Sequence, residues 1–123
     1  MNNLGSKVWI IPDGFLPLKS SGNLKSHEAV CVLNLGEKDA NINLSIYFED
    51  RNPMENFKAV CGAKRTNHIR LDKIMDNKGN KIPVNIPYSI KIESDEPIIV
   101  QHSRMDTTQA EMTLMTTIAY ELK

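Results

Sequence analysis

The sequence predicts an all-β protein, a single-domain antiparallel β-sandwich of the jelly-roll kind with seven or eight strands across residues 1–123. Three observations predict it. Short runs rich in β-branched and aromatic residues recur about every ten residues. Clusters of Gly, Pro, Asn and Asp separate these runs. No long stretch has the spacing of an amphipathic helix.

The first three predicted strands lie in the first half of the chain. Residues 7–11 form the first, which Pro12-Asp13-Gly14 ends before a long loop to residue 26. Residues 29–33 form the second, which is apolar on both faces. Residues 41–48 form the third and alternate between apolar and polar side chains, so this strand has one buried face and one exposed face.

The remaining predicted strands are residues 57–61, 65–71, 88–93 and 98–104. Asp95-Glu96-Pro97 predicts a turn between the last two. The tail, residues 112–120, fits two structures. Thr108 and Glu111 have the spacing of a helix capping box, but alternation and three threonines favour a strand.

The composition indicates which kinds of binding partner and which cell compartment can be expected. Fifteen basic and fifteen acidic residues balance, so there is no bulk electrostatic attraction to nucleic acid or to an anionic membrane. No apolar run is long enough to span a membrane, and the first residues lack the pattern of a secretory signal. A cytoplasmic protein is therefore expected. In that compartment, Cys31 and Cys61 are expected to be buried free thiols.

Two predicted strands, 29–33 and 98–100, are apolar on both faces. The outer face of a sandwich sheet should be wet, so these strands need a cover. The simplest cover is a second copy of the chain, which predicts an oligomer. The alternative is a central strand that lies under a loop.

The three histidines lie at predicted strand ends among polar residues, in Ser26-His27-Glu28, Arg65 to Arg70 and Gln101-His102-Ser103-Arg104. One interpretation is a metal-dependent jelly-roll enzyme that uses His27, Glu28, His68 and His102. No pair of histidines has the spacing of a ligand motif. The other interpretation is a set of hydrogen-bonding groups at strand ends, with no metal and no cofactor.

Arginine recurs beside these histidines, at Arg65, Arg70 and Arg104. Its planar fork suits a carboxylate or phosphate ligand, and it equally suits an acid within the chain. The internal acids considered are Glu28, Asp106 and Glu111. On a strand, His102 and Arg104 share one face, whereas Gln101 and Ser103 share the other.

Catalytic motifs are missing from the sequence. There is no nucleophile elbow, no glycine-rich phosphate loop and no metalloprotease helix. Cys31 lies in the middle of an apolar strand, which does not suit a thiolate nucleophile. Trp9, in the first strand, is expected in the core. The sequence therefore favours a protein that is not an enzyme.

Several runs follow one another in a single order: Ser26-His27-Glu28 with Val30-Cys31, Asp39-Ala40, Ile46-Tyr47, Arg65-Thr66 with His68-Ile69-Arg70, residues 98–104 with Asp106 and Gln109-Ala110-Glu111, and Thr117-Ile118-Ala119-Tyr120. Together they resemble the sensory rhodopsin transducer family, over nearly the whole chain. The resemblance implies an all-β sandwich that assembles as a homotetramer and relays a signal from a membrane photoreceptor. The wider family is similar to carbohydrate-binding modules, and a role in DNA binding has been proposed for it.

The leading hypothesis is a cytoplasmic, homo-oligomeric signal transducer that binds a small polar molecule such as a sugar and contacts a signalling partner. Its predicted ligand-binding residues are His27, Glu28, Arg65, His68, Arg70, Gln101, His102 and Arg104. The alternatives are the metal-dependent enzyme and a DNA-binding regulator. The regulator would gather Lys58, Lys64, Arg65 and Arg70 on one face of an oligomer.

Overall fold

The protein is an antiparallel all-β sandwich, which confirms the predicted fold class. A computed structural model describes residues 4–18, 26–106 and 113–123. The strands are β1 (Ser6–Gly14), β2 (His27–Asn34), β3 (Ala40–Tyr47), β4 (Met54–Cys61), β5 (Arg65–Arg70), β6 (Tyr88–Asp106), β7 (Thr113–Ile118) and β8 (Tyr120–Leu122). Among these residues, no helix is long and apolar enough to cross a membrane.

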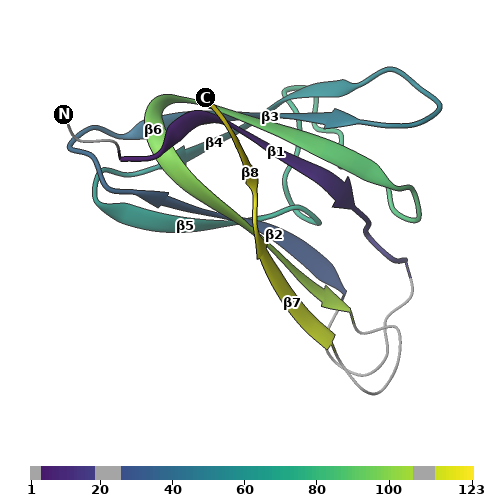
Figure 1. The fold of residues 1–123 in the computed structure, drawn as a ribbon. Helices are drawn as coiled ribbons and strands as arrows, with labels where there is room; N and C mark the ends of the chain where they lie inside the picture. The colour runs from purple at the N-terminus through teal and green to yellow at the C-terminus, as the bar shows by residue number, and fades with distance from the viewer. Residues whose placement is uncertain (1–3, 19–25, 107–112) are drawn as a thin grey trace.

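One strand, β6, belongs to both layers of the sandwich. Its first half pairs with β3 and β1, and its second half pairs with β2 and β7. Sheet A therefore has the order β4-β3-β6-β1-β8, and sheet B has the order β5-β2-β6-β7. In Figure 1, β6 runs as one long green ribbon from the upper layer to the lower end of the molecule.

The predicted turn at residues 95–97 is wrong, because β6 continues through it. The register explains why Pro97 is accepted there. Ser94 is the last residue paired with β3, and Ile99 is the first paired with β2. Pro97 lies where the strand changes sheets and has no ladder partner, so its missing N–H removes no ladder hydrogen bond.

Other strand ends also differ from the prediction. Pro12 to Gly14 belong to β1 and do not end it. Only Val8, Trp9 and Ile10 pair with β8. Pro12 lies beyond that ladder, so its missing N–H removes no hydrogen bond from it. β4 begins at Met54, before the predicted start. The tail is a strand, as favoured, but it is divided into β7 and β8. The capping-box pair lies outside the described residues.

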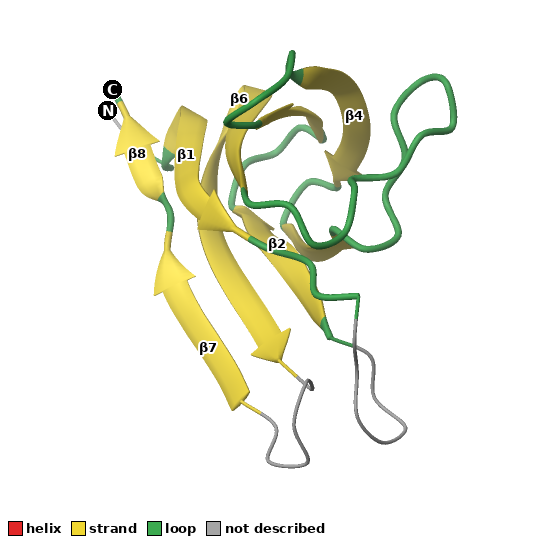
Figure 2. Ribbon diagram, turned by 90° about the vertical axis from the view of Figure 1, so that its right-hand side faces the viewer, coloured by secondary structure: helices red, strands yellow, loops and turns green. Residues whose placement is uncertain are grey.

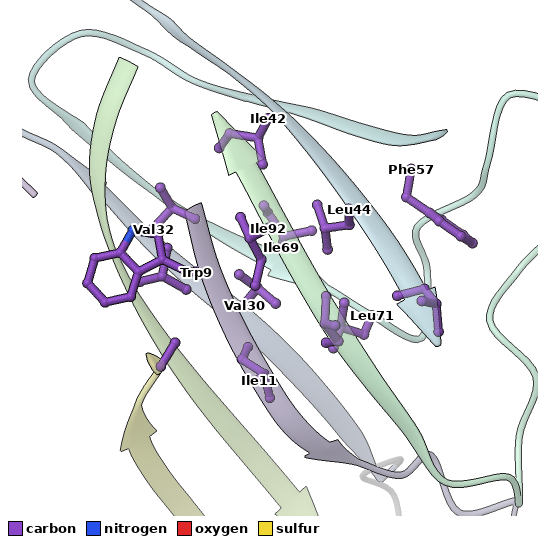
Figure 3. Packing of buried hydrophobic residues seen from close by; sticks show 14 of the residues in the cluster. Trp9, Ile11, Val30, Val32, Ile42, Leu44, Phe57, Ile69, Leu71 and Ile92 are labelled. Carbon is purple, nitrogen blue, oxygen red and sulfur yellow. The ribbon is translucent and has the colours of Figure 1, made fainter. Parts of the chain in front are cut away.

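The core fills the space between the inner faces of the two sheets (Figure 3). On β3, Ile42, Leu44 and Ile46 are buried as predicted, but Ser45, predicted on the exposed face, is buried as well. Trp9 is also buried, as expected. Its indole N–H donates to the carbonyl oxygens of Ser6 and Ile98, 3.0 Å away in each case, so the one polar atom of the ring is satisfied.

The outer face of sheet B is less covered than its inner face. Along β2, Val30 and Val32 are buried in the core, whereas Cys31 is half-buried and Leu33 is exposed. Both cysteines are free, as expected, but only Cys61 is buried. These exposed apolar groups belong to the strands that the sequence analysis expected a second copy of the chain to cover.

Candidate functional site

A fully buried carboxylate, Glu28 on β2, lies at the centre of the candidate site. Its Oε1 accepts a hydrogen bond from the Tyr88 hydroxyl at 2.6 Å and lies 3.2 Å from His102 Nε2. Its Oε2 accepts from Arg104 Nε and from the Phe15 backbone N–H, both at 2.8 Å. Both oxygens are therefore satisfied by three side chains of the long strand β6 and by one backbone N–H of the loop after β1.

Strand register brings these groups together. Glu28 lies opposite Arg104, and Val30 lies opposite His102, so both polar side chains share the inner face of sheet B with Glu28. Tyr88 is the first residue of β6, in sheet A, and lies opposite Gly14 of β1. A Cβ atom at Gly14 would stand 2.3 Å from the Tyr88 ring, so only glycine leaves room for that ring.

The environment of Glu28 favours its ionised form. Burial alone raises the pKa of this carboxyl, but the hydrogen bonds from His102, Tyr88 and Phe15 outweigh burial and hold the pKa below its ordinary value. Burial and the adjacent Glu28 charge raise the pKa of Tyr88, so the phenol stays a donor. Because its lone pairs are occupied, Glu28 is poorly placed to act as a general acid or base.

A cavity of about 280 Å³ lies beside this cluster. Its lining is Ile11, Pro12, Asp13, His102, Arg104, Met115 and Thr117. Nη2 of Arg104 lies 4.0 Å from the Asp13 carboxylate at the exposed side. The cavity thus combines a cation, an anion and a hydroxyl with an apolar wall, which is the usual composition of a small-molecule site.

A second cavity, of about 470 Å³, lies between β3 and β4 on sheet A. Asn41, Asn43, Lys58 and Val60 line it beside the two strands. It contains no buried charge, and the Asn41 amide is already bonded to Asp95. The cavity beside Glu28 is the better candidate because its polar groups are held by a buried network.

The structure divides the predicted ligand-binding residues between two faces of sheet B. Glu28, His102 and Arg104 meet on the inner face. His27, His68, Arg70 and Gln101 belong to the alternate positions that form the outer face. Arg65 lies at the far end of β5, opposite Asn34. No single site therefore contains all eight residues.

On the outer face, Arg70 makes a bidentate ion pair with Asp72, with distances of 2.8 and 2.9 Å. Burial raises the pKa of Asp72, but the Arg70 hydrogen bonds and the nearby His27 lower it below its ordinary value. Arg70 is thus paired internally, which was one of the two predicted outcomes for the arginines. Arg104 is paired internally too, through Glu28.

The geometry gives no support to the two alternatives. In the part of the chain that the structure describes, no three His, Cys, Asp or Glu side chains are placed to hold a metal ion. His102 lies on the opposite face of sheet B from His27 and His68. Of the four cations suggested for DNA binding, Lys64 pairs with Glu37 and Arg70 pairs with Asp72.

Sequence reasoning missed Asp13, Tyr88 and Asp72. Tyr88 was assigned only to the buried side of a strand, although a buried phenol needs a hydrogen-bond partner and so signals a polar group nearby. Asp13 was assigned to a turn. No local pattern links Tyr88 to Glu28 or Asp13 to Arg104, because these contacts arise from the pairing of distant strands.

The fold and this site define a small β-sandwich with a ligand-sized cavity beside a saturated, buried carboxylate. The chain belongs to the Anabaena sensory rhodopsin transducer family, whose family model matches residues 4–121. This confirms the resemblance found in the sequence.

Two solved structures are similar to the chain. The protein in "Crystal Structure of Thermotoga maritima 1070" is 38% identical, with a TM-score of 0.86 over 99% of this chain and 97% of that one. The Anabaena sensory rhodopsin transducer is 35% identical, with a TM-score of 0.75 over 89% of this chain and 96% of that one. No curated protein sequence matches the chain.

Proposed function

We propose that this protein is a non-enzymatic, cytoplasmic signal transducer that binds a small polar molecule, such as a sugar, in the cavity beside Glu28. Occupancy of the cavity is relayed to a partner protein. Membership of the transducer family and the similarity to the Anabaena sensory rhodopsin transducer support the transducer role. A membrane photoreceptor of the rhodopsin type, or another signalling protein, is the proposed partner.

The composition of the cavity carries the binding proposal. Arg104 offers guanidinium donors, Asp13 offers a carboxylate acceptor, and Thr117 offers a hydroxyl that does both. Ile11 and Met115 supply the apolar wall. A sugar presents hydroxyl groups that donate and accept, together with C–H faces, so it matches both parts of this lining.

The state of Glu28 supports a binding role over a catalytic one. Four protein groups contact its two oxygens, and it is fully buried. Glu28 instead fixes Arg104 through its Nε, so the guanidinium is held in place at the cavity with Nη2 4.0 Å from the Asp13 carboxylate. The Glu28 carboxylate thus orients Arg104, which is the side chain proposed to bind the ligand.

The same strand supports the relay. Arg104 and His102 both lie on β6, which also forms the centre of sheet A. A ligand that moves Arg104 acts on β6 and on its neighbour β7 at the molecular edge. The proposed homotetramer would cover the outer face of sheet B, where Cys31, Leu33 and Ile99 remain partly exposed.

Titration calorimetry with D-glucose, D-galactose and D-xylose tests the binding proposal. Arg104→Ala should lose at least about 2 kcal/mol of binding free energy for the sugar that binds, because a charge-assisted hydrogen bond is removed. Thr117→Val tests the cavity without touching Glu28. Arg51→Ala, an exposed change outside the cavity, should bind normally.

Unchanged affinity in both cavity variants would place the ligand elsewhere. Absence of heat with every sugar would refute the sugar assignment. A separate measurement tests the relay: the protein should co-sediment with vesicles that contain its rhodopsin partner, and Arg104→Ala should alter that binding when sugar is present. Equal binding with and without sugar would contradict the relay.

A further inference from the structure

Within the described residues, one buried side-chain polar atom accepts no hydrogen bond from the protein: Oδ1 of Asn43 on β3. Native proteins contain few such atoms, because a buried acceptor that lacks a donor carries its whole desolvation penalty. Asn43 lines the second cavity, of about 470 Å³, between β3 and β4. A molecule that binds there with a hydrogen to donate would satisfy this oxygen.

Strand register determines which side chains surround the cavity. Asn41 lies opposite Val60, and Asn43 lies opposite Lys58. These four side chains share the outer face of sheet A, because the alternate residue Ile42 is buried in the core. The wall of the cavity therefore combines amide groups, one ammonium group and an apolar side chain.

The hydrogen-bonding state of the wall defines what it can bind. The backbone N–H and Nδ2 of Asn41 both donate to the Asp95 carboxylate at 2.8 Å, so its Oδ1 remains as an acceptor. Among the described residues, no carboxylate forms an ion pair with Lys58. The wall thus offers the amide oxygens of Asn41 and Asn43 as acceptors and the ammonium group of Lys58 as a charged donor.

A β-bulge lies directly before Lys58. The step from Met54 to Phe57 on β4 faces a step that is one residue shorter on β3. Within the bulge, Asn56 has a φ of 70°, which asparagine tolerates better than most residues. Bulges bend a strand and are frequent beside functional sites, where they change the direction of a side chain. This one precedes the cation of the cavity.

We propose that this cavity is a second binding site, for a small polyhydroxy monocarboxylic acid such as an aldonic acid. The carboxylate lies beside Lys58, and hydroxyl groups donate to Asn43 and Asn41. Of the described residues in the lining, Lys58 is the cation, and its charge matches that of one carboxylate. A phosphate dianion would keep an unmatched charge near the Asp95 carboxylate.

This site is separate from the cavity beside Glu28. Figure 2 shows β4 on the opposite side of the molecule from β7 and β8. β3 and β4 line the second cavity, whereas residues of β1, β6 and β7 line the first, and the two linings share no residue. The second site therefore does not rest on the proposed function.

Titration calorimetry of the full chain with sodium D-gluconate tests the site. Wild type should bind gluconate at least about tenfold more tightly than D-sorbitol, which has a CH₂OH group in place of the carboxylate. Lys58→Met removes the ammonium group and should weaken gluconate binding at least about tenfold. Lys81→Met is the matched control: Lys81 is exposed and does not line the cavity, so gluconate binding should be unchanged.

Asn43→Leu tests the unpaired acceptor with two measurements. Leucine has nearly the same shape without the carbonyl oxygen, so gluconate binding should weaken. The urea midpoint of the free protein should be unchanged or raised, because Oδ1 of Asn43 accepts no hydrogen bond from the protein. A lowered midpoint would show that Oδ1 is bonded in the fold, which would overturn its role in binding.

Two further results would overturn the site: gluconate that binds no more tightly than sorbitol, and full gluconate affinity in Lys58→Met. If Arg104→Ala lost gluconate binding and Lys58→Met kept it, the acid would occupy the cavity beside Glu28. That result would refute this inference and leave the proposed function in place. Absence of heat with the neutral sugars would refute the sugar assignment without affecting the gluconate measurements.

Discussion

Glu28 and Tyr88 are joined by a buried hydrogen bond of 2.6 Å, although 60 residues separate them in the chain. The bond links β2 of sheet B to the beginning of β6 in sheet A, so it connects the two layers inside the core. A buried carboxylate is costly unless donors surround it. The Glu28–Tyr88 pair therefore contributes both to the site and to the stability of the sandwich.

Tyr88→Phe should destabilise the protein by about 1–3 kcal/mol, because Oε1 of Glu28 loses its shortest hydrogen bond and remains buried. Urea unfolding followed by Trp9 fluorescence measures the change. Tyr120→Phe is the control, since Tyr120 is 65% exposed, and it should change the free energy of unfolding by less than about 0.5 kcal/mol. Equal effects of the two substitutions would contradict this account of Tyr88.

Glu28 also predicts a pH dependence of stability. Its folded-state pKa lies below the ordinary value of 4.5, so the folded protein binds this proton less readily than the unfolded chain. The stabilisation is therefore complete above pH 4.5 and is lost as the pH falls through the folded-state pKa. Wild type should lose stability more steeply than Glu28→Gln as the pH falls through this window.

The measurement is the urea midpoint of both proteins at several values between roughly pH 6 and pH 3. Other acids with lowered pKa, such as Asp72, contribute equally to both curves, so the difference between the curves isolates Glu28. Parallel curves would show that the cluster does not hold Glu28 in its ionised form.

Gly14→Ala should act on the site through packing. The added Cβ would meet the ring of Tyr88 at 2.3 Å, so the ring must move and its bond to Glu28 is strained. We expect a loss of roughly 1–3 kcal/mol in the free energy of unfolding. Gly62→Ala is the control, because its nearest contact is a flexible Arg65 carbon at 3.4 Å. If Gly14→Ala unfolded at the same urea concentration as the wild type, the close packing of residue 14 against the Tyr88 ring would be refuted.

The two cysteines should differ in reactivity. Cys61 is fully buried, and burial is the main cause that raises the pKa of its thiol, whereas Cys31 is half-buried on the outer face of sheet B. In the folded subunit, a thiol reagent such as Ellman's reagent should reach Cys31 where the proposed tetramer is dissociated, and it should reach Cys61 only after unfolding. Cys31→Ser should abolish the reaction of the folded protein. A fast reaction that survives this substitution would contradict the burial of Cys61.

Local patterns predicted most of the fold. The alternation of residues 41–48 placed Ile42 and Leu44 in the core, and the tail proved to be a strand as favoured. The errors came from proline. A proline usually marks a strand end, but Pro97 lies at the crossing between sheets, where β6 needs no ladder bond. Such a position is defined by tertiary pairing and leaves no local signal.

The site was predictable only in part. The shared face of His102 and Arg104 follows from the period of a strand, and Glu28 was singled out beside a histidine. The meeting of these residues with Tyr88 depends on which strands pair and in which register. Local sequence does not specify that choice, so the predicted residues of the outer face were assigned to the same site as those of the inner face.

The crossing of β6 also has a mechanical consequence. β6 is a covalent connection between sheet A and sheet B, and Pro97 is one of the few residues that lie between its two sets of partners. The pyrrolidine ring fixes φ at that point. Pro97 therefore removes one of the soft backbone torsions from the segment that connects the two sheets.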